Sequence, residues 1–152
     1  MSKADPHALL NAVLFACTLN SIRSPMASAT LRHLSRNHIY AASAGARRGG
    51  TDTFAIAVMD EIGIDISGHV PIAISDLNDT SFDLIITLSL EAHNQALELT
   101  RTMAVEVEFW PTQDPSATGG KREQRLDAYR QVRDQLFERI KPRFPPGVSA
   151  HV

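Results

Sequence analysis

The apolar run 12–16, which leads directly into Cys17, constrains the fold of this chain more than any other stretch. A continuous apolar run of this length is typical of a strand that is buried on both faces of a sheet. Five residues separate Cys17 from Arg23, and Pro25 follows closely, which favours a helix start because proline suits the first helical position. The segment therefore predicts a strand, a tight loop and a helix, with the cysteine at the end of the strand.

The loop after Cys17 has the composition of an anion site. Six residues can curl so that successive backbone N–H groups point at one spot, and the positive end of the following helix adds to the attraction. The same field favours a thiolate over a thiol at Cys17. Arg23 supplies a planar fork that can hold two oxygens of a tetrahedral oxyanion. Ser24 is expected to cap the helix or, if turned inward, to donate its hydroxyl to the sulfur of Cys17.

The alternative for this loop is a buried structural cysteine next to an ordinary surface arginine. For an isolated cysteine and arginine that alternative would be preferred. Here the expected strand, the spacing, the serine and the proline all agree, and together they favour an oxyanion site.

Length and composition indicate a globular chain. At 152 residues it is expected to form a single domain, 1–152, around one sizeable core. A net charge of −2 gives no reason to expect nucleic acid or an acidic membrane as a partner. One cysteine excludes an internal disulfide and fits a reducing compartment, and no apolar run reaches membrane-spanning length. We therefore expect a cytoplasmic protein.

Apolar patterning predicts alternating strands and helices along the chain. Strands are expected at 12–16, 39–44, 82–88 and 103–109, and helices at 25–35, 54–62, 90–99 and from 126 to Pro142. Residues 1–10 and the tail after Phe144 are expected to be loose. The alternation predicts an α/β fold, in which helices cover both faces of a parallel sheet in three layers. Ligands of such sheets bind beyond the carboxyl ends of the strands, where Cys17 is expected to lie.

Two further segments bear on the expected site. The basic stretch 47–50 reads most simply as a solvated turn, and the alternative is that it draws anions toward the loop.

Asp114-Pro115 lies in the loop after the fourth expected strand, and this loop emerges at the same edge of the sheet as Cys17. A thiolate that attacks a phosphate monoester needs an acid to protonate the leaving oxygen, and Asp114 is the candidate. The pair Asp-Pro alone would be explained as ordinary turn chemistry. Its place after the fourth expected strand and before the last helix favours a role for Asp114 as the acid.

The residues quoted so far resemble the low-molecular-weight protein tyrosine phosphatases and the arsenate reductases that share their fold. The active-site loop of that family reads Cys, two residues, Asn, two residues, Arg, Ser, and this chain matches it at Cys17, Asn20, Arg23 and Ser24. Outside the loop, the resemblance extends to Ser43-Ala44-Gly45, to the Gly-Ile-Asp-Ile-Ser stretch at 63–67 and to Trp110-x-x-x-Asp114-Pro115.

The resemblance implies a four-stranded parallel sheet of order 2-1-3-4 and a site that uses neither a metal nor a cofactor. It implies Cys17 as nucleophile, Arg23 as oxyanion ligand and Asp114 as acid and base. It gives binding or supporting roles to Thr18, Leu19, Asn20, Ser21, Ile22, Ser24 and His69. Of these, Asn20 is expected to hold the loop in shape, and His69 aligns with a family histidine that hydrogen-bonds the loop asparagine.

The chain departs from the family pattern at four positions. Leu19 stands where the family usually has glycine, whose backbone freedom a side chain would restrict. Ile22 replaces a second loop cysteine found in many tyrosine phosphatases, so an oxidised Cys17 has no neighbouring thiol. Ser116 replaces a tyrosine of eukaryotic members. Ser89 lies near the place where thioredoxin-coupled arsenate reductases carry further cysteines.

Three functions remain open from the sequence. The first is a phosphomonoesterase that forms a cysteinyl-phosphate intermediate on a phosphorylated protein or a small phosphomonoester. The second is an arsenate reductase that uses an external thiol such as glutathione or mycothiol. The third, prompted by Leu19, is a weakly active module that binds an oxyanion or a phosphopeptide.

Overall fold

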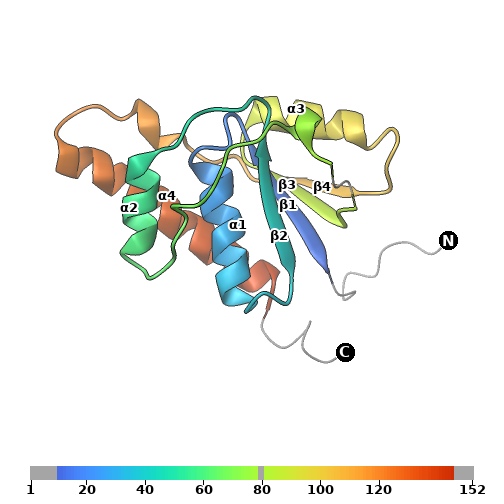
Figure 1. Cartoon of the computed structure of the whole chain (residues 1–152), viewed down its shortest axis with the longest axis horizontal. Helices are drawn as coiled ribbons and strands as arrows, with labels where there is room; N and C mark the ends of the chain where they lie inside the picture. The colour runs from blue at the N-terminus through green and yellow to red at the C-terminus, as the bar shows by residue number, and fades with distance from the viewer. Residues whose placement is uncertain (1–9, 79–80, 146–152) are drawn as a thin grey trace.

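The computed structural model describes residues 10–78 and 81–145, and Figure 1 shows their arrangement. The expectations for the first nine residues and for the tail from 146 onward lie outside the described residues. The elements follow the chain as β1 (Ala12–Cys17), α1 (Arg23–Leu34), β2 (Tyr40–Gly45), α2 (Thr53–Asp60), η1 (Ile74–Asp76), β3 (Leu84–Thr87), α3 (Leu90–Leu99), β4 (Glu106–Phe109), η2 (Pro115–Ala117) and α4 (Arg122–Arg143), where η marks a 3₁₀ turn.

The four strands form one parallel sheet in the order β2-β1-β3-β4, which confirms the expected order. Helices α1, α2 and α4 cover one face and α3 covers the other, so the three layers are also confirmed (Figure 1). In the register, Ala16 of β1 lies between Ala44 of β2 and Thr87 of β3. The central position of β1 places Cys17 in the middle of the carboxyl edge of the sheet.

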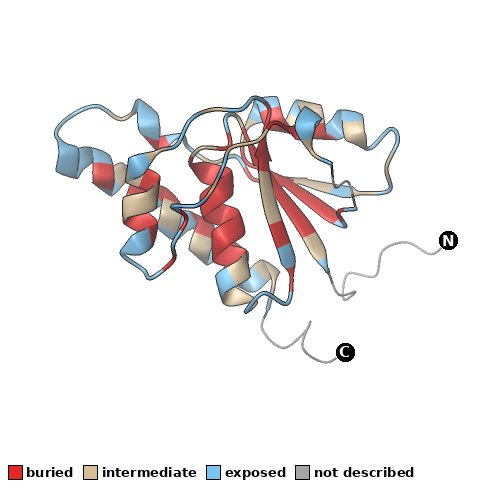
Figure 2. Cartoon of the chain, in the orientation of Figure 1, coloured by how far each residue is buried: buried red, intermediate tan, exposed pale blue. Residues whose placement is uncertain are grey.

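Alternate residues of β1 pack into two separate apolar layers. Val13 and Phe15 face the layer of α1, α2 and α4, whereas Leu14 and Ala16 face α3. All four side chains are buried, as the continuous red of the central strands in Figure 2 shows. The apolar positions expected for the last helix are buried as well and form its inner face: Leu126, Tyr129, Val132, Leu136 and Ile140. Among the described residues, no helix combines the length and the apolarity that a membrane span requires.

The apolar face expected for α3 is wrong in part. Leu90 and Leu97 are 63% and 45% exposed, and the buried residues of this helix are Ala92 and Ala96. The two alanines lie four residues apart and so share one face of the helix. Their small side chains let α3 lie close against the sheet, and the larger leucines are left on the outer side.

The ends of several elements differ from the sequence expectation. The third and fourth strands are shorter than expected, because regular pairing between them covers only Leu84–Thr87 and Glu106–Phe109. The last helix continues to Arg143 and does not end at Pro142. Proline is tolerated there because it lies in the last turn, where Phe144 N–H still donates to the carbonyl of Ile140 at 3.1 Å.

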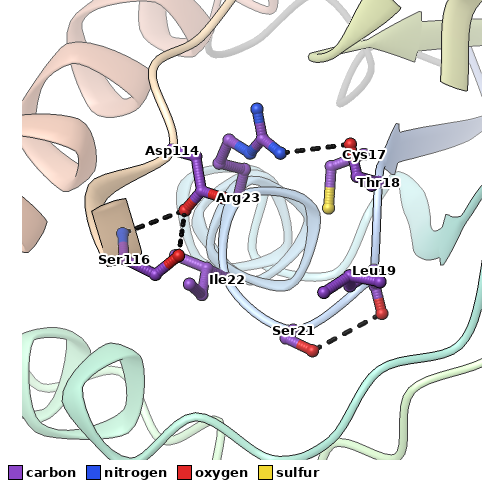
Figure 3. A pocket seen from close by; sticks show the side chains of 8 residues that line it. All are labelled: Cys17, Thr18, Leu19, Ser21, Ile22, Arg23, Asp114 and Ser116. Atoms are coloured by element: carbon purple, nitrogen blue, oxygen red, sulfur yellow. Dashed lines mark hydrogen bonds between the residues drawn. The ribbon is translucent and has the colours of Figure 1, made fainter. Parts of the chain in front are cut away.

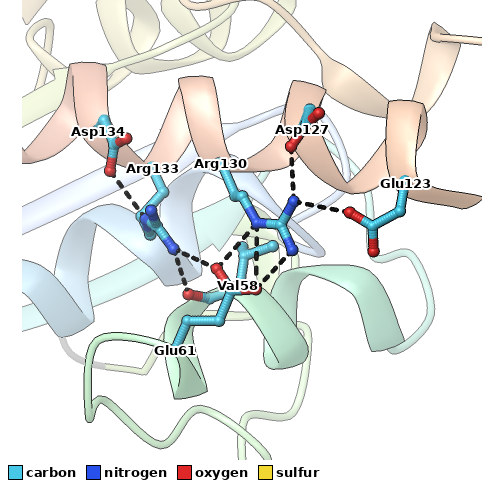
Figure 4. A network of polar contacts seen from close by, with 7 residues as sticks. All are labelled: Val58, Glu61, Glu123, Asp127, Arg130, Arg133 and Asp134. Carbon is cyan, nitrogen blue, oxygen red and sulfur yellow. Dashed lines mark hydrogen bonds and ion pairs between the residues drawn. The ribbon is translucent and has the colours of Figure 1, made fainter.

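A network of ion pairs joins α2 to α4 (Figure 4). Glu61, which caps the carboxyl end of α2, accepts hydrogen bonds from Arg130 at 2.8 Å and from Arg133 at 2.8 Å. Arg133 also donates to the backbone carbonyl of Val58 at 2.8 Å. The hydrogen bond from Arg130, with a further one from Arg133, lowers the pKa of Glu61 to about 2 from an ordinary value near 4.5. The pairs therefore favour the ionised form of Glu61 in the folded state.

Replacing Glu61 by Gln is expected to reduce stability at neutral pH and to matter less in acid. The lowered pKa contributes stability that is fully present above about pH 4.5 and is lost as the pH falls toward 2. Because the side chain of Glu61 is 38% exposed, solvent screening should limit the loss at pH 7 to about 1 kcal/mol.

Urea unfolding of the wild type and of Glu61→Gln at pH 7 and at pH 3 measures this difference. Glu98→Gln is the matched control, because Glu98 pairs with Arg101 on an exposed surface. A loss of stability that is as large at pH 3 as at pH 7 would contradict the assignment to the Glu61 carboxylate.

Candidate active site

A pocket of about 90 Å³ opens at the carboxyl end of β1 (Figure 3). It brings together Cys17, Arg23 and Asp114, the three residues that the sequence placed in catalytic roles. The other lining residues are Thr18, Leu19, Ser21, Ile22 and Ser116. Asn20, Ser24 and His69 do not line the pocket and lie behind the loop. Across the described residues, no group of three or more His, Cys, Asp or Glu side chains could hold a metal ion.

Backbone hydrogen bonds fix the orientation of the loop. The carbonyl oxygens of Cys17, Thr18 and Leu19 accept from backbone N–H groups of the segment 46–49 at 2.8–2.9 Å. These carbonyls therefore face away from the pocket, toward a second segment of chain. In a trans peptide the N–H points opposite to the carbonyl, so the N–H groups that follow are turned inward. The result is a concave set of donors of the kind that binds anions.

Asn20 holds the centre of the loop from behind. It is fully buried and has a φ of 58°, a left-handed conformation that asparagine tolerates better than most residues. Its side-chain amide donates to the Ser24 hydroxyl at 2.9 Å, and its side-chain carbonyl accepts from Ile72 N–H at 2.9 Å. The backbone carbonyl of Asn20 lies 2.8 Å from Nε2 of His69. This histidine donates from Nε2 in its neutral form, which burial favours by lowering the pKa of His69.

Leu19 does not carry the backbone conformation that its glycine counterpart suggested. The residue of this loop with a positive φ is its neighbour Asn20. Leu19 is 39% exposed and lies on the rim of the pocket. A side chain at position 19 is therefore accommodated without left-handed backbone strain.

The capping role expected for Ser24 is wrong, and its alternative position under the sulfur is observed. Helix α1 begins at Arg23, and the residue before it is Ile22, which provides no side-chain cap. Ser24 is buried in the first turn, with its hydroxyl 3.0 Å from the sulfur of Cys17. Because Asn20 donates to this hydroxyl, the hydroxyl hydrogen is available to Cys17 or, at 3.3 Å, to the carbonyl of Ala44.

Arg23 connects the loop to the segment that carries Asp114. Its guanidinium donates to the carbonyl of Thr112 at 2.8 Å and to the hydroxyl of Thr18 at 3.3 Å. The residue is 8% exposed and lines the same pocket as Cys17, with its guanidinium directed at Thr18 (Figure 3). This position allows a charged donor to face the same space as the inward N–H groups.

Asp114 lies in extended backbone immediately before η2. One of its carboxylate oxygens, Oδ1, accepts from the backbone N–H of Ser116 at 2.9 Å and from its hydroxyl at 2.7 Å. Trp110 fixes the start of this segment: its buried ring meets Phe15 edge-on at 6.4 Å, and the guanidinium of Arg139 lies 4.9 Å above it. The hydrogen bonds from Ser116, after Pro115, and the packing of Trp110, before it, thus hold the carboxylate of Asp114 at the pocket.

The sequence did not indicate that the segment 46–49 supports the loop. The side chain of Arg47 forms two hydrogen bonds with Glu91 at 3.0 Å, so it is paired and does not act as a free cation. Gly45 approaches the loop so closely that an added Cβ would lie 2.7 Å from the backbone nitrogen of Asn20. The signal available in the sequence was the pair of glycines, Gly45 and Gly49, around a short basic stretch.

The fold and the pocket define a class of enzyme in which a cysteine at a strand end faces an anion-binding loop, an arginine and an aspartate. The chain belongs to the low molecular weight phosphotyrosine protein phosphatase family, whose family model matches residues 12–143.

Curated relatives of the chain carry the name arsenate reductase. The glutaredoxin arsenate reductase of Synechocystis sp. is 34% identical over 128 residues, which cover 84% of this chain and 92% of the relative. The arsenate reductase of Shouchella clausii is 35% identical over 131 residues, which cover 85% of this chain and 91% of the relative.

Solved structures with the same fold include both arsenate reductases and phosphatases. An arsenate reductase in its phosphate-binding state superposes with a TM-score of 0.67 at 31% identity, over 86% of this chain and 93% of that chain. A tyrosine phosphatase of Erwinia amylovora superposes with a TM-score of 0.71 at 20% identity, over 90% of this chain and 92% of that chain. The second similarity concerns the fold alone.

Replacing Asn20 by Ala is expected to destabilise the protein by about 2–3 kcal/mol, because it leaves buried partners unsatisfied and puts alanine in a left-handed conformation. The control is Asn37→Ala, which changes an exposed asparagine with a similar φ of 62°. The control should lose only about 1 kcal/mol from the backbone. Urea unfolding measures both, and equal losses would show that the side-chain hydrogen bonds of Asn20 contribute nothing.

Proposed function

We propose that the chain hydrolyses phosphomonoesters through a covalent intermediate on Cys17. The observation that supports this most directly is that Cys17, Arg23 and Asp114 line one pocket. The nucleophile and the oxyanion ligand flank one loop, the acid comes from a distant segment of the chain, and phosphoryl transfer to a thiolate uses all three.

The first step transfers the phosphoryl group to sulfur. The thiolate of Cys17 attacks phosphorus in line, the S–P bond forms and the P–O bond to the leaving group breaks. Asp114 gives its proton to the departing oxygen. Arg23 and the inward N–H groups of the loop bind the equatorial oxygens, whose charge they stabilise in the transition state.

The second step releases phosphate. Asp114, now a carboxylate, takes a proton from a water molecule that attacks phosphorus, and the S–P bond breaks. The hydroxyl of Ser24, 3.0 Å from the sulfur, donates to the thiolate as it leaves. The enzyme returns to its starting protonation state.

The size of the pocket bears on the substrate. About 90 Å³ is far below the 300–1,000 Å³ that is usual for a pocket enclosing a drug-sized ligand. We infer that only the phosphoryl group enters, while the rest of a phosphorylated protein or small phosphomonoester lies over the rim. Ser116 offers no aromatic surface there, so a strong preference for phosphotyrosine is not expected.

Arsenate reduction with an external thiol is a second candidate, favoured by the 34% and 35% identical relatives named arsenate reductase. Arsenate and phosphate are both tetrahedral oxyanions, so one loop can hold either. Cys17 would attack arsenic and expel water. A thiol such as glutathione or mycothiol would then attack the sulfur of Cys17, so that the S–As bond breaks and its electrons leave with arsenite. A second thiol would reduce the mixed disulfide.

The thiol that attacks the sulfur of Cys17 must come from outside the chain. Cys17 is the single cysteine of the chain, so no internal disulfide relay can form. Both reactions also require Cys17 to be reduced, which supports a reducing compartment such as the cytoplasm.

We further propose that the full chain 1–152 folds as one domain, since the family model spans 12–143.

A third candidate is a weakly active module that only binds an oxyanion. Its motivation was strain at Leu19, and the backbone of Leu19 lies outside the left-handed region. Turnover distinguishes this candidate from the other two.

The phosphatase proposal predicts turnover of p-nitrophenyl phosphate without added metal. Cys17→Ser should abolish it, and Asp114→Ala should slow phosphoryl transfer about 10²–10⁴-fold, the usual contribution of general acid catalysis. Asp60→Ala is the control, because Asp60 is an exposed residue at the end of α2. Full activity in Cys17→Ser would refute the mechanism.

The arsenate proposal predicts that arsenite forms when the protein receives arsenate with glutathione or mycothiol. The rate should be zero without a thiol and should rise with thiol concentration. Parallel kinetics on p-nitrophenyl phosphate, a phosphotyrosine peptide and arsenate with thiol decide between the candidates. Arsenite formation without any added thiol would contradict the external relay.

A further inference from the structure

A second segment holds the anion loop from its outer side. Residues Ala46–Gly49, which we call the brace, donate three backbone N–H groups to the loop. Ala46, Arg47 and Gly49 donate at 2.9, 2.8 and 2.8 Å to the carbonyls of residues 17, 18 and 19 in turn. The brace therefore sets the direction in which three successive loop peptides point.

Gly49 makes the close approach of brace and loop possible. An added Cβ at this position would lie 2.6 Å from the hydroxyl oxygen of Ser21 and 2.7 Å from the Cβ of Leu19. Real Cβ atoms do not approach other heavy atoms so closely, so one of the two segments would have to move. At the adjacent Gly50, an added Cβ would meet nothing within 4 Å.

The brace is anchored to α3, and the segment that follows it is tied to α4. Toward α3, Arg47 pairs with Glu91, and the side-chain amide of Gln95 donates to the carbonyl of Ala46 at 3.1 Å. Toward α4, the hydroxyl of buried Tyr129 donates to Asp52 at 2.9 Å. Asp52 also accepts from the N–H of Ala55 and so caps α2. A side chain at position 49 would therefore have to displace either the anchored brace or the loop, and either shift would disturb the hydrogen bonds between them.

We propose that Gly49 is a positioning residue for oxyanion binding. By allowing the brace to contact the loop, it keeps the inward N–H groups directed at one point. This inference rests on the proposed function, since it assumes that the loop binds a tetrahedral oxyanion. Preorganised donors lose much of their effect when displaced by a fraction of an ångström, because they no longer converge on the charge.

The test compares phosphate binding by the wild type, Gly49→Ala and Gly50→Ala, measured by calorimetry at 25 °C, where circular dichroism shows each protein to be folded. Gly49→Ala should weaken phosphate binding about tenfold and lower kcat/KM for p-nitrophenyl phosphate at least as much. Gly50→Ala should bind within about twofold of the wild type, because it adds the same methyl group in open space. Both variants keep the carbonyl of residue 50, which accepts from the Ser21 hydroxyl at 2.6 Å, but only in Gly49→Ala does the new methyl group lie against that hydroxyl.

A second variant, Gln95→Ala, removes the hydrogen bond that anchors the brace at the carbonyl of Ala46. It should weaken phosphate binding about threefold, and wild-type affinity in this variant would overturn the inference if Gly49→Ala does not fold. Folded Gly49→Ala with wild-type affinity, or equal weakening in Gly49→Ala and Gly50→Ala, would overturn the inference. Wild-type protein that binds no phosphate would overturn the proposed function itself, which separates the two failures.

Discussion

The outward direction of four successive carbonyls, from Cys17 to Asn20, is the constraint on which the site depends. Three of them accept from backbone N–H groups of the brace and the fourth contacts His69. Each such bond turns the next N–H toward the pocket, so the geometry of the donors is fixed before any ligand arrives. Preorganised dipoles of this kind require no reorganisation when charge develops, which is why they contribute strongly to transition-state stabilisation.

The fold supplies the partners for these bonds. Because β1 lies between β2 and β3, the loop that leaves it meets the segment that follows β2, and this segment is in turn bonded to α3. Asn20 links the loop to Ile72 and Ser24, and Arg23 links it to the segment before Asp114. The groups proposed for catalysis are therefore held by tertiary contacts with distant parts of the described chain, and a short peptide with the same loop would lack them.

Much of this arrangement could be predicted from the sequence. The apolar run before Cys17, the spacing to Arg23 and the buried positions of α4 carry local signals, and the order of strands followed from the resemblance. What could not be predicted depends on contacts between distant segments. Ser24 turns toward Cys17 because Asn20 and the end of β2 surround it, and the brace acts through backbone atoms that leave no side-chain signature. In α3, the two alanines are the buried residues because the helix face that carries them packs closely against the sheet, where larger side chains would not fit.

The most direct test of the account is the rate at which iodoacetamide alkylates Cys17 at neutral pH, measured with and without phosphate or arsenate. An ionised sulfur at the floor of an oxyanion pocket should react rapidly, and either anion should protect it in proportion to its binding. Slow alkylation, or alkylation that neither anion affects, would show that the loop does not bind oxyanions over a reactive thiolate and would contradict the central claim.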